Sequence, residues 1–94
     1  MNNYIIRVLL HNAEGNDYLV LQQRLANIGV VDVILATDGR WYKLPPAEYV
    51  YSGSESAEVV RQACVNAANA VGRSCAVLVS QATHVVWQGL PLVK

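Results

Sequence analysis

The order of the apolar patterns constrains the fold of this chain more than any other feature of its sequence. Apolar residues recur at helical spacing in two segments, 18–28 and 60–71. Strand-like runs, rich in apolar and β-branched residues, surround these segments at 4–10, 30–37 and 75–80. The predicted order is therefore strand, helix, strand, further strand, helix and strand.

The ends of both helical segments carry boundary signals. Asn16 or Asp17 can cap the start of the first helix, and Gly29 follows its last apolar residue. The second helix is expected to open after Ser52–Ser54, with carboxylates in its first turn, and to stop at Gly72.

Asp38-Gly39 is the strongest turn signal, because both residues tolerate the positive φ of a type I′ hairpin turn. The returning strand begins at Arg40 and is interrupted at Pro45-Pro46, since proline cannot donate to a strand ladder. Pairing is expected to resume over 48–51, which places this strand at an edge or a bend.

Two helices that each join two strands fit one antiparallel sheet with both helices on one face. Right-handed crossovers make this β-α-β-β-α-β order a ferredoxin-like sandwich of the α+β class. A chain of 94 residues is the size of one such domain, so residues 1–94 are predicted to form a single unit. Residues 84–88 are expected to add a short extra strand.

The second face of such a sheet has no helix over it. Strand alternation predicts that the inward side chains are Ile6, Val8, Leu10, Val31, Val33 and Leu35. The outward side chains are then Ile5, Arg7, Leu9, Asp32, Ile34 and Ala36, half of them apolar. Either the C-terminal segment with Val85, Trp87 and Leu90 covers this face, or two copies pack sheet against sheet. An exchanged C-terminal strand would satisfy both ideas, and a homodimer is expected.

Composition excludes several classes of protein. Hydrophobic residues make up 53% of the chain, which indicates a real core and excludes disorder. Seven basic side chains balance seven acidic ones, so nucleic acid binding would need a local cluster. The N-terminus lacks a secretory pattern and no apolar run could span a bilayer, which predicts a cytoplasmic protein. Cys64 and Cys75 are interpreted as small buried hydrophobic residues.

No nucleotide-binding, zinc or nucleophile-elbow motif is present, and the carboxylates are scattered, so neither a metal nor a cofactor is predicted. His11 follows the first strand, where a catalytic side chain could lie on a loop; His84 is the weaker candidate. Each is also interpretable as an ordinary surface residue.

The densest group of functional side chains is Arg40-Trp41-Tyr42-Lys43, where two cations flank two aromatic rings on the hairpin. This pattern suits a single strand of RNA, held by phosphate pairing and base stacking. Arg24 and Arg7 could extend a basic track. The alternative is an exposed turn whose tryptophan caps the core.

The chain resembles the small GhoS-type antitoxin endoribonucleases, which are similar in fold to the small nucleases of CRISPR adaptation. The resemblance covers nearly the whole chain and rests on the order and spacing of its parts. These are the aromatic-led strand at Tyr4-Ile5-Ile6, the first helix with Leu19, Leu21 and Arg24, the Asp38-Gly39 turn, the Leu44–Tyr51 return and the serine-rich start of the second helix.

The resemblance implies a sequence-selective endoribonuclease that acts as an antitoxin by cutting the mRNA of a small membrane toxin. The CRISPR relatives keep an acidic residue for metal at the end of the first strand, where this chain reads Leu10-His11-Asn12. Metal-independent cleavage would then use the substrate's 2′-hydroxyl, with His11 as proton carrier, Arg24, Arg40 and Lys43 on phosphate, and Trp41 and Tyr42 on bases. The alternative is a non-catalytic homodimeric binding module of the same fold.

Overall fold

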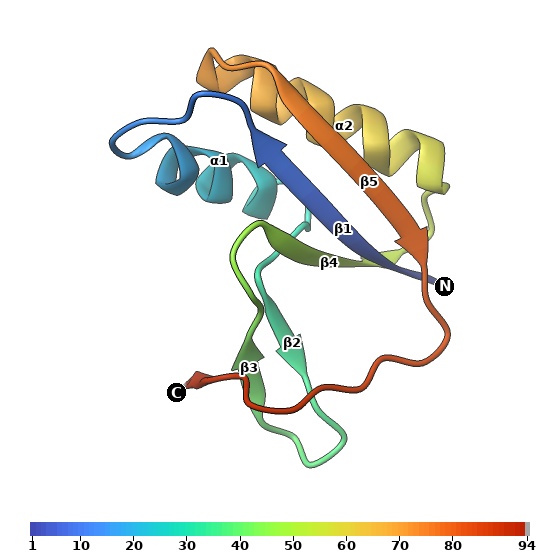
Figure 1. Ribbon diagram of the computed structural model, residues 1–94. Coiled ribbons are helices and arrows are strands. Elements are labelled where there is room, and N and C mark those ends of the chain that lie inside the picture. Colours follow the sequence, from blue (N-terminus) through green and yellow to red (C-terminus); the bar gives the residue numbers. More distant parts are fainter. Residues whose placement is uncertain (94) are drawn as a thin grey trace.

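The computed structural model describes residues 1–93, which form two helices and six strands (Figure 1). In chain order the elements are β1 (Asn2–Leu10), α1 (Asp17–Ala26), β2 (Val33–Leu35), β3 (Trp41–Lys43), β4 (Glu48–Gly53), α2 (Ala57–Val71), β5 (Cys75–Gln81) and β6 (Leu92–Val93). The predicted α+β class and the order of both helices among the first five strands are confirmed.

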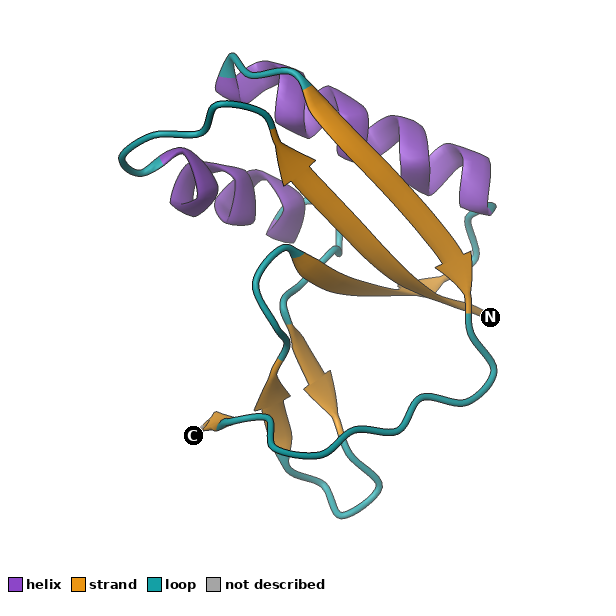
Figure 2. Ribbon diagram, in the orientation of Figure 1, coloured by secondary structure: helices purple, strands orange, loops and turns teal. Residues whose placement is uncertain are grey.

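The strands form two antiparallel sheets. The main sheet has the order β4-β1-β5, with Ile5 opposite Val50 on one side and Arg7 opposite Leu78 on the other. The small sheet has the order β2-β3-β6. Both helices cover one face of the main sheet, and the small sheet lies away from them (Figure 2).

The core lies between the main sheet and the two helices. Tyr4, Ile6, Val8 and Leu10 alternate with more exposed neighbours along β1, which confirms the predicted inward face of this strand. They pack against buried residues of the helices and of β4, namely Leu21, Leu25, Tyr49, Val60, Cys64 and Ala68. Cys64 is buried as predicted, which raises the pKa of its thiol to about 11, and Cys75 is half-buried.

The predicted single sheet is divided at Pro45-Pro46. The interruption itself is confirmed, because β3 ends at Lys43 and β4 begins at Glu48. Ala47 has a φ of +67°, which turns the chain there, so β3 and β4 belong to different sheets. A single bridge, between Val31 and Val50, connects the segment before β2 to the main sheet.

The strand predicted at 30–37 is shorter than expected, because β2 covers three residues. Leu35 was predicted to point inward and is 51% exposed. The inward assignment assumed that this strand continues in the sheet that the helices cover. β2 instead belongs to the small sheet, which lies away from both helices (Figure 2). The alternation rule therefore does not apply to this strand.

The hairpin turn is not of type I′. Gly39 has a φ of +84°, but Asp38 does not have a positive φ. The amide of Gly39 donates to the carbonyl of Ala36 at 3.0 Å, and the amide of Ala36 donates to the carbonyl of Arg40 at 2.8 Å. This is a three-residue loop with glycine in the left-handed position, in which the Asp38 carboxylate accepts from the amide of Arg40.

The C-terminal segment differs most from the prediction. No strand forms at 84–88; instead Leu92 and Val93 form β6, which pairs with Tyr42 and Trp41 of β3.

The helices start and end close to the predicted positions. Ser56 caps α2 by accepting from the amide of Val59, and Gly72, with a φ of +94°, ends it.

Tyr49 is buried in the core, and within residues 1–93 its hydroxyl has no hydrogen-bond partner. Burial, followed by the nearby Asp32 carboxylate, raises the pKa of Tyr49 to about 12, and the nearby Gln22 side chain opposes this rise without forming a hydrogen bond of normal geometry. The buried hydroxyl keeps its desolvation cost without a compensating bond, so Tyr49→Phe is expected to raise the free energy of unfolding by roughly 1 kcal/mol.

Tyr18 provides the matched control, because its hydroxyl accepts a hydrogen bond from the amide of Leu10 at 2.8 Å. Tyr18→Phe should lower the free energy of unfolding by about 1 kcal/mol. Urea denaturation of both variants measures the difference. An equal loss of stability in the two variants would show that the Tyr49 hydroxyl has a partner after all.

Candidate functional site

A concave region lies between the β2–β3 hairpin and the segment that links β5 to β6. A hollow of about 570 Å³ separates the two, with one wall from the hairpin and the other from residues 84–90. We call it the aromatic groove; its lining includes Ile34, Thr37, Tyr42, His84, Trp87 and Leu90. Its volume falls in the range of small-ligand sites, which are concave and mostly apolar.

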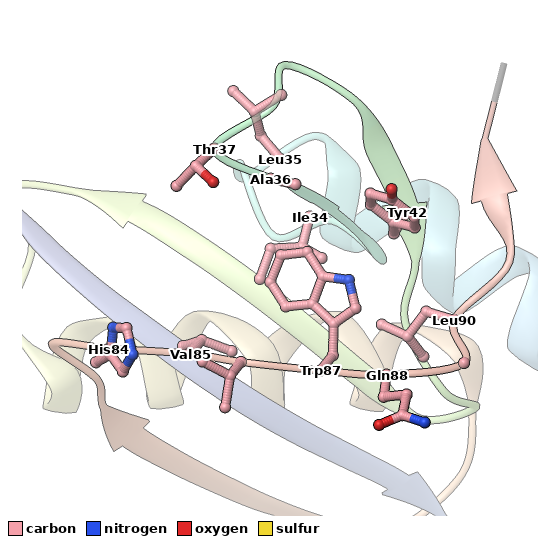
Figure 3. A pocket seen from close by; sticks show the side chains of 12 residues that line it. Ile34, Leu35, Ala36, Thr37, Tyr42, His84, Val85, Trp87, Gln88 and Leu90 are labelled. Carbon is pink, nitrogen blue, oxygen red and sulfur yellow. The ribbon is translucent and has the colours of Figure 1, made fainter.

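Two aromatic rings join the walls of this groove. The indole of Trp87 extends from the C-terminal segment toward Ile34 and Tyr42, and His84 lies farther along the same segment (Figure 3). The ring centroids of Tyr42 and Trp87 are 5.7 Å apart and tilted by 58°. Such tilted pairs are a favoured aromatic geometry, so this contact helps to hold the C-terminal segment against the hairpin.

A second hollow of about 680 Å³ adjoins the aromatic groove and shares Ile34, Thr37 and His84 with it. Its lining includes Trp41 from the hairpin and Asn3 and Ser52 from the main sheet. Trp41 is 45% exposed. Successive residues of a strand point to opposite faces, and Trp41 and Tyr42 accordingly line different hollows. The hairpin therefore presents one aromatic ring to each hollow.

Backbone hydrogen bonds hold the two walls of the aromatic groove in place. In addition to the pairing of β6 with β3, the amide of Lys43 donates to the carbonyl of Pro91 at 2.9 Å, and the amide of Leu44 donates to the carbonyl of Asp32. The Lys43 ammonium lies 2.6 Å from a carboxylate oxygen of Asp32 across the two strands. These contacts hold the hairpin and the C-terminal end together.

The structure separates the predicted RNA-binding cations. Arg40 is exposed at the hairpin turn beside Trp41, and within residues 1–93 its side chain makes no ion pair. Lys43 is paired with Asp32, and Arg7 is paired with Glu48 at 2.8 Å on the open face of the main sheet. Arg24 lines a different hollow, between α1 and α2. Of the predicted set, the hairpin residues Arg40, Trp41, Tyr42 and Lys43 are brought together.

His11 lies at the other end of β1 from the hollow lined by Asn3. His11 is eight positions after Asn3 in the chain, or about 26 Å along an extended strand at ~3.3 Å per residue. The Nδ1 atom of His11 is 3.2 Å from the Ser74 hydroxyl, and the His11 amide donates to the Ser74 carbonyl. His11 therefore does not share a site with the hairpin.

The surroundings of His11 contain Arg73 rather than Arg24. Arg73, next to Ser74 in the chain, donates from Nε to an Asp17 carboxylate oxygen at 2.7 Å. The backbone hydrogen bond from Glu14, followed by that of Arg73, lowers the pKa of Asp17 below its ordinary value. Asp17 begins α1 and Arg24 lies in its last turn, so the predicted pair of His11 and Arg24 is not brought together.

The open face of the main sheet is a second feature of the surface. Leu9 and Leu78 are 43% and 64% exposed on this face. The C-terminal segment lies near Ile5, because Val85 of that segment and Ile5 line the same hollow. The segment leaves Leu9 and Leu78 exposed. The expectation that this segment covers the face therefore holds at most for one end of the sheet.

Trp87 lines the aromatic groove, a position that was not predicted from the sequence, because one of the two alternatives placed Trp87 over the open face. Its signal was present: the chain has only two tryptophans, and the other belongs to the predicted binding hairpin. Across residues 1–93, no three His, Cys, Asp or Glu side chains are placed to hold a metal ion. No helix in the same range is long and apolar enough to cross a membrane.

Comparisons with known proteins found no match: no family model, no curated protein and no solved structure matches the chain.

Proposed function

We propose that the protein is a cytoplasmic RNA-binding regulator that takes the unpaired bases of an mRNA into the aromatic groove and the adjoining hollow. The observation that carries this proposal is the assembly of Trp41, Tyr42 and Trp87 around two adjoining hollows, with the exposed Arg40 next to Trp41 at the hairpin turn. Aromatic rings beside a cation are the usual platform for single-stranded nucleic acid.

Stacking, rather than charge, would supply most of the affinity. Trp41 is nearly half exposed and lines a hollow, so part of its ring is accessible to a stacking base. Each stacked base contributes about 1–3 kcal/mol to binding. Thr37, His84 and Gln88 add hydrogen-bonding groups to the groove, which could contact base edges.

The electrostatic contribution would be small. Arg7 and Lys43 are already paired with carboxylates, which leaves Arg40 as the predicted phosphate contact at the hairpin. The slope of log affinity against log salt is about −0.7 per phosphate contact for single strands, so a shallow salt dependence is expected.

Sequence-selective cleavage of the bound mRNA, as in the antitoxin endoribonucleases, is part of this proposal with His11 as proton carrier. The substrate's 2′-hydroxyl oxygen would attack the phosphorus as His11 accepts its proton, and the bond from phosphorus to the 5′-oxygen would break. The 5′-oxygen would take a proton from water, and the other product would be a 2′,3′-cyclic phosphate. Since His11 lies at the far end of β1 from the aromatic hollows, binding and cleavage would be separable by mutation.

The ferredoxin-like topology is likewise proposed. The strand order β5-β1-β4 continues through the Val31–Val50 bridge to the segment after α1, which supports a sandwich whose hairpin has bent out of the sheet.

A non-catalytic homodimeric binding module is the second candidate. It is favoured by the apolar residues Leu9 and Leu78 on the open sheet face, which two copies could bury against each other. An exchanged β6 would be another way to join two copies, although in this structure β6 pairs with β3 of its own chain.

Titration with short single-stranded RNA pools is expected to change the intrinsic tryptophan fluorescence, because both tryptophans of the chain line the proposed site. Arg40→Ala should weaken binding and reduce the salt slope by about 0.7. Lys43→Ala is the matched control and should change the slope less, since Asp32 already neutralises this charge.

The same titrations, run with labelled RNA in the presence and absence of EDTA, separate binding from cleavage. Discrete products that survive EDTA and vanish in His11→Ala, with binding retained, would support the catalytic part. Unchanged fluorescence across a diverse RNA pool would refute the RNA proposal and favour the homodimeric module.

A further inference from the structure

β5 is an edge strand whose outer side is unpaired. The main sheet has the order β4-β1-β5, so β5 bonds to β1 on one side and to nothing in residues 1–93 on the other. Residues opposite each other alternate between hydrogen-bonded and non-hydrogen-bonded pairs in an antiparallel ladder. The bonds from His11 to Ser74 and from Ala82 to Asn3 fix this alternation at both ends of the strand.

This alternation shows which backbone groups face outward. The backbone amides and carbonyls that point toward β1 are those of Ser74, Ala76, Leu78, Ser80 and Ala82. The amides and carbonyls that point away from the sheet are therefore those of Cys75, Val77, Val79 and Gln81.

The β5 edge also lacks the features that normally prevent strands from pairing. Its sequence, Cys-Ala-Val-Leu-Val-Ser-Gln, has no charged residue and no proline, and its register with β1 runs without a bulge. Natural edge strands are usually short, charged or bulged, because an unprotected edge is a template for another strand. Seven apolar or neutral residues are long enough to pair stably.

We propose that β5 pairs with β5 of a second copy in antiparallel orientation, about a twofold axis at Leu78, to give a continuous six-stranded sheet. In this register Val77 lies opposite Val79 of the partner subunit, and Cys75 lies opposite Gln81 of the partner subunit. All the outward amides and carbonyls of both strands then find partners. Leu78, the most exposed apolar side chain of the open face, would lie against its own copy.

A second copy is the partner that this edge fits best. The register centred on Leu78 uses every outward group of the strand, and an uncharged strand meets no like charge when it pairs with itself. Because α2 packs over β5, the two copies of this helix would lie next to each other above the joined strands. β5 contributes no residue to the lining of the aromatic groove, so pairing at this edge uses none of the groove residues.

Light scattering after size-exclusion chromatography tests this dimer with three variants. Val79→Pro removes an outward amide without removing a bond to β1, and it should yield a monomer where the unmodified chain is a dimer. Val79→Ala keeps that amide and should remain dimeric. Leu9→Lys changes the open face but not the edge, and should also remain dimeric.

Amide hydrogen exchange of the unmodified chain gives a second readout that needs no variant. The amides of Val77 and Val79 should exchange slowly at high protein concentration and quickly on dilution, whereas the amide of Leu78 should be protected at both. A chain that is monomeric at every concentration would overturn the proposal. A dimer that survives Val79→Pro and dissociates in Leu9→Lys would replace it with face-to-face packing.

Discussion

Replacing Trp41 with Ala is expected to weaken the binding of single-stranded RNA by about 5- to 150-fold, the equivalent of losing one stacked base at about 1–3 kcal/mol. Trp41 is the aromatic residue with the most accessible ring on the hairpin, and its strand is held on both sides by β2 and β6. A rigid strand presents the ring with little loss of conformational entropy on binding, so most of the stacking energy should be retained as affinity.

Trp87 remains as the fluorescent reporter in this variant, so the same titration measures the change. Trp41→Phe should restore most of the affinity, because it keeps an aromatic face at the same position. Leu19→Ala is the control for a loss of exposed apolar surface elsewhere, since Leu19 is 56% exposed on α1. Equal affinity of Trp41→Ala and the unmodified chain would remove Trp41 from the site.

The helices and the main sheet could be predicted from the sequence because their patterns are long and regular. β1 covers nine residues, and from Tyr4 to Leu10 every second side chain is buried; α2 covers fifteen residues with a cap at each end. A register error in either element would expose several large apolar side chains at once. Such segments therefore specify their own position against the core.

The small sheet could not be predicted in the same way, because its strands are three, three and two residues long. Periods cannot be recognised over so few residues. The turn at Ala47 determines that β3 leaves the main sheet, and a positive φ at alanine has no sequence signal. The position of Leu35 follows from that turn rather than from its own neighbours.

The candidate site was predicted in part for a related reason. Arg40, Trp41 and Tyr42 are adjacent in the sequence, so their proximity required no knowledge of the fold. Trp87 contacts Tyr42 only because β6 returns to pair with β3. Arg7 is neutralised by Glu48, which lies 41 residues later in the chain on a different strand. Contacts of this kind depend on topology, which single residues do not reveal.

Ending the chain after Ala82 is expected to abolish RNA binding while it preserves the fold of the main sheet and helices. The buried core cluster lies wholly between Tyr4 and Ala68, and the segment removed contributes no member to it. It does supply Trp87 and one wall of the aromatic groove.

The truncated chain should therefore keep its helical circular dichroism and a cooperative thermal transition, with a loss of affinity greater than that of Trp41→Ala. Trp87→Leu in the full-length chain is the matched control, because it removes the ring but leaves the segment and β6 in place. RNA titration followed by anisotropy of a labelled strand compares the unmodified chain, the truncated chain and Trp87→Leu without relying on tryptophan fluorescence.

If the truncated chain binds as tightly as the unmodified chain, the exposed Trp41 is sufficient for binding and the groove is not the site. If it does not fold, the C-terminal segment belongs to the core, and the separation of a stable main sheet from a binding lobe is wrong.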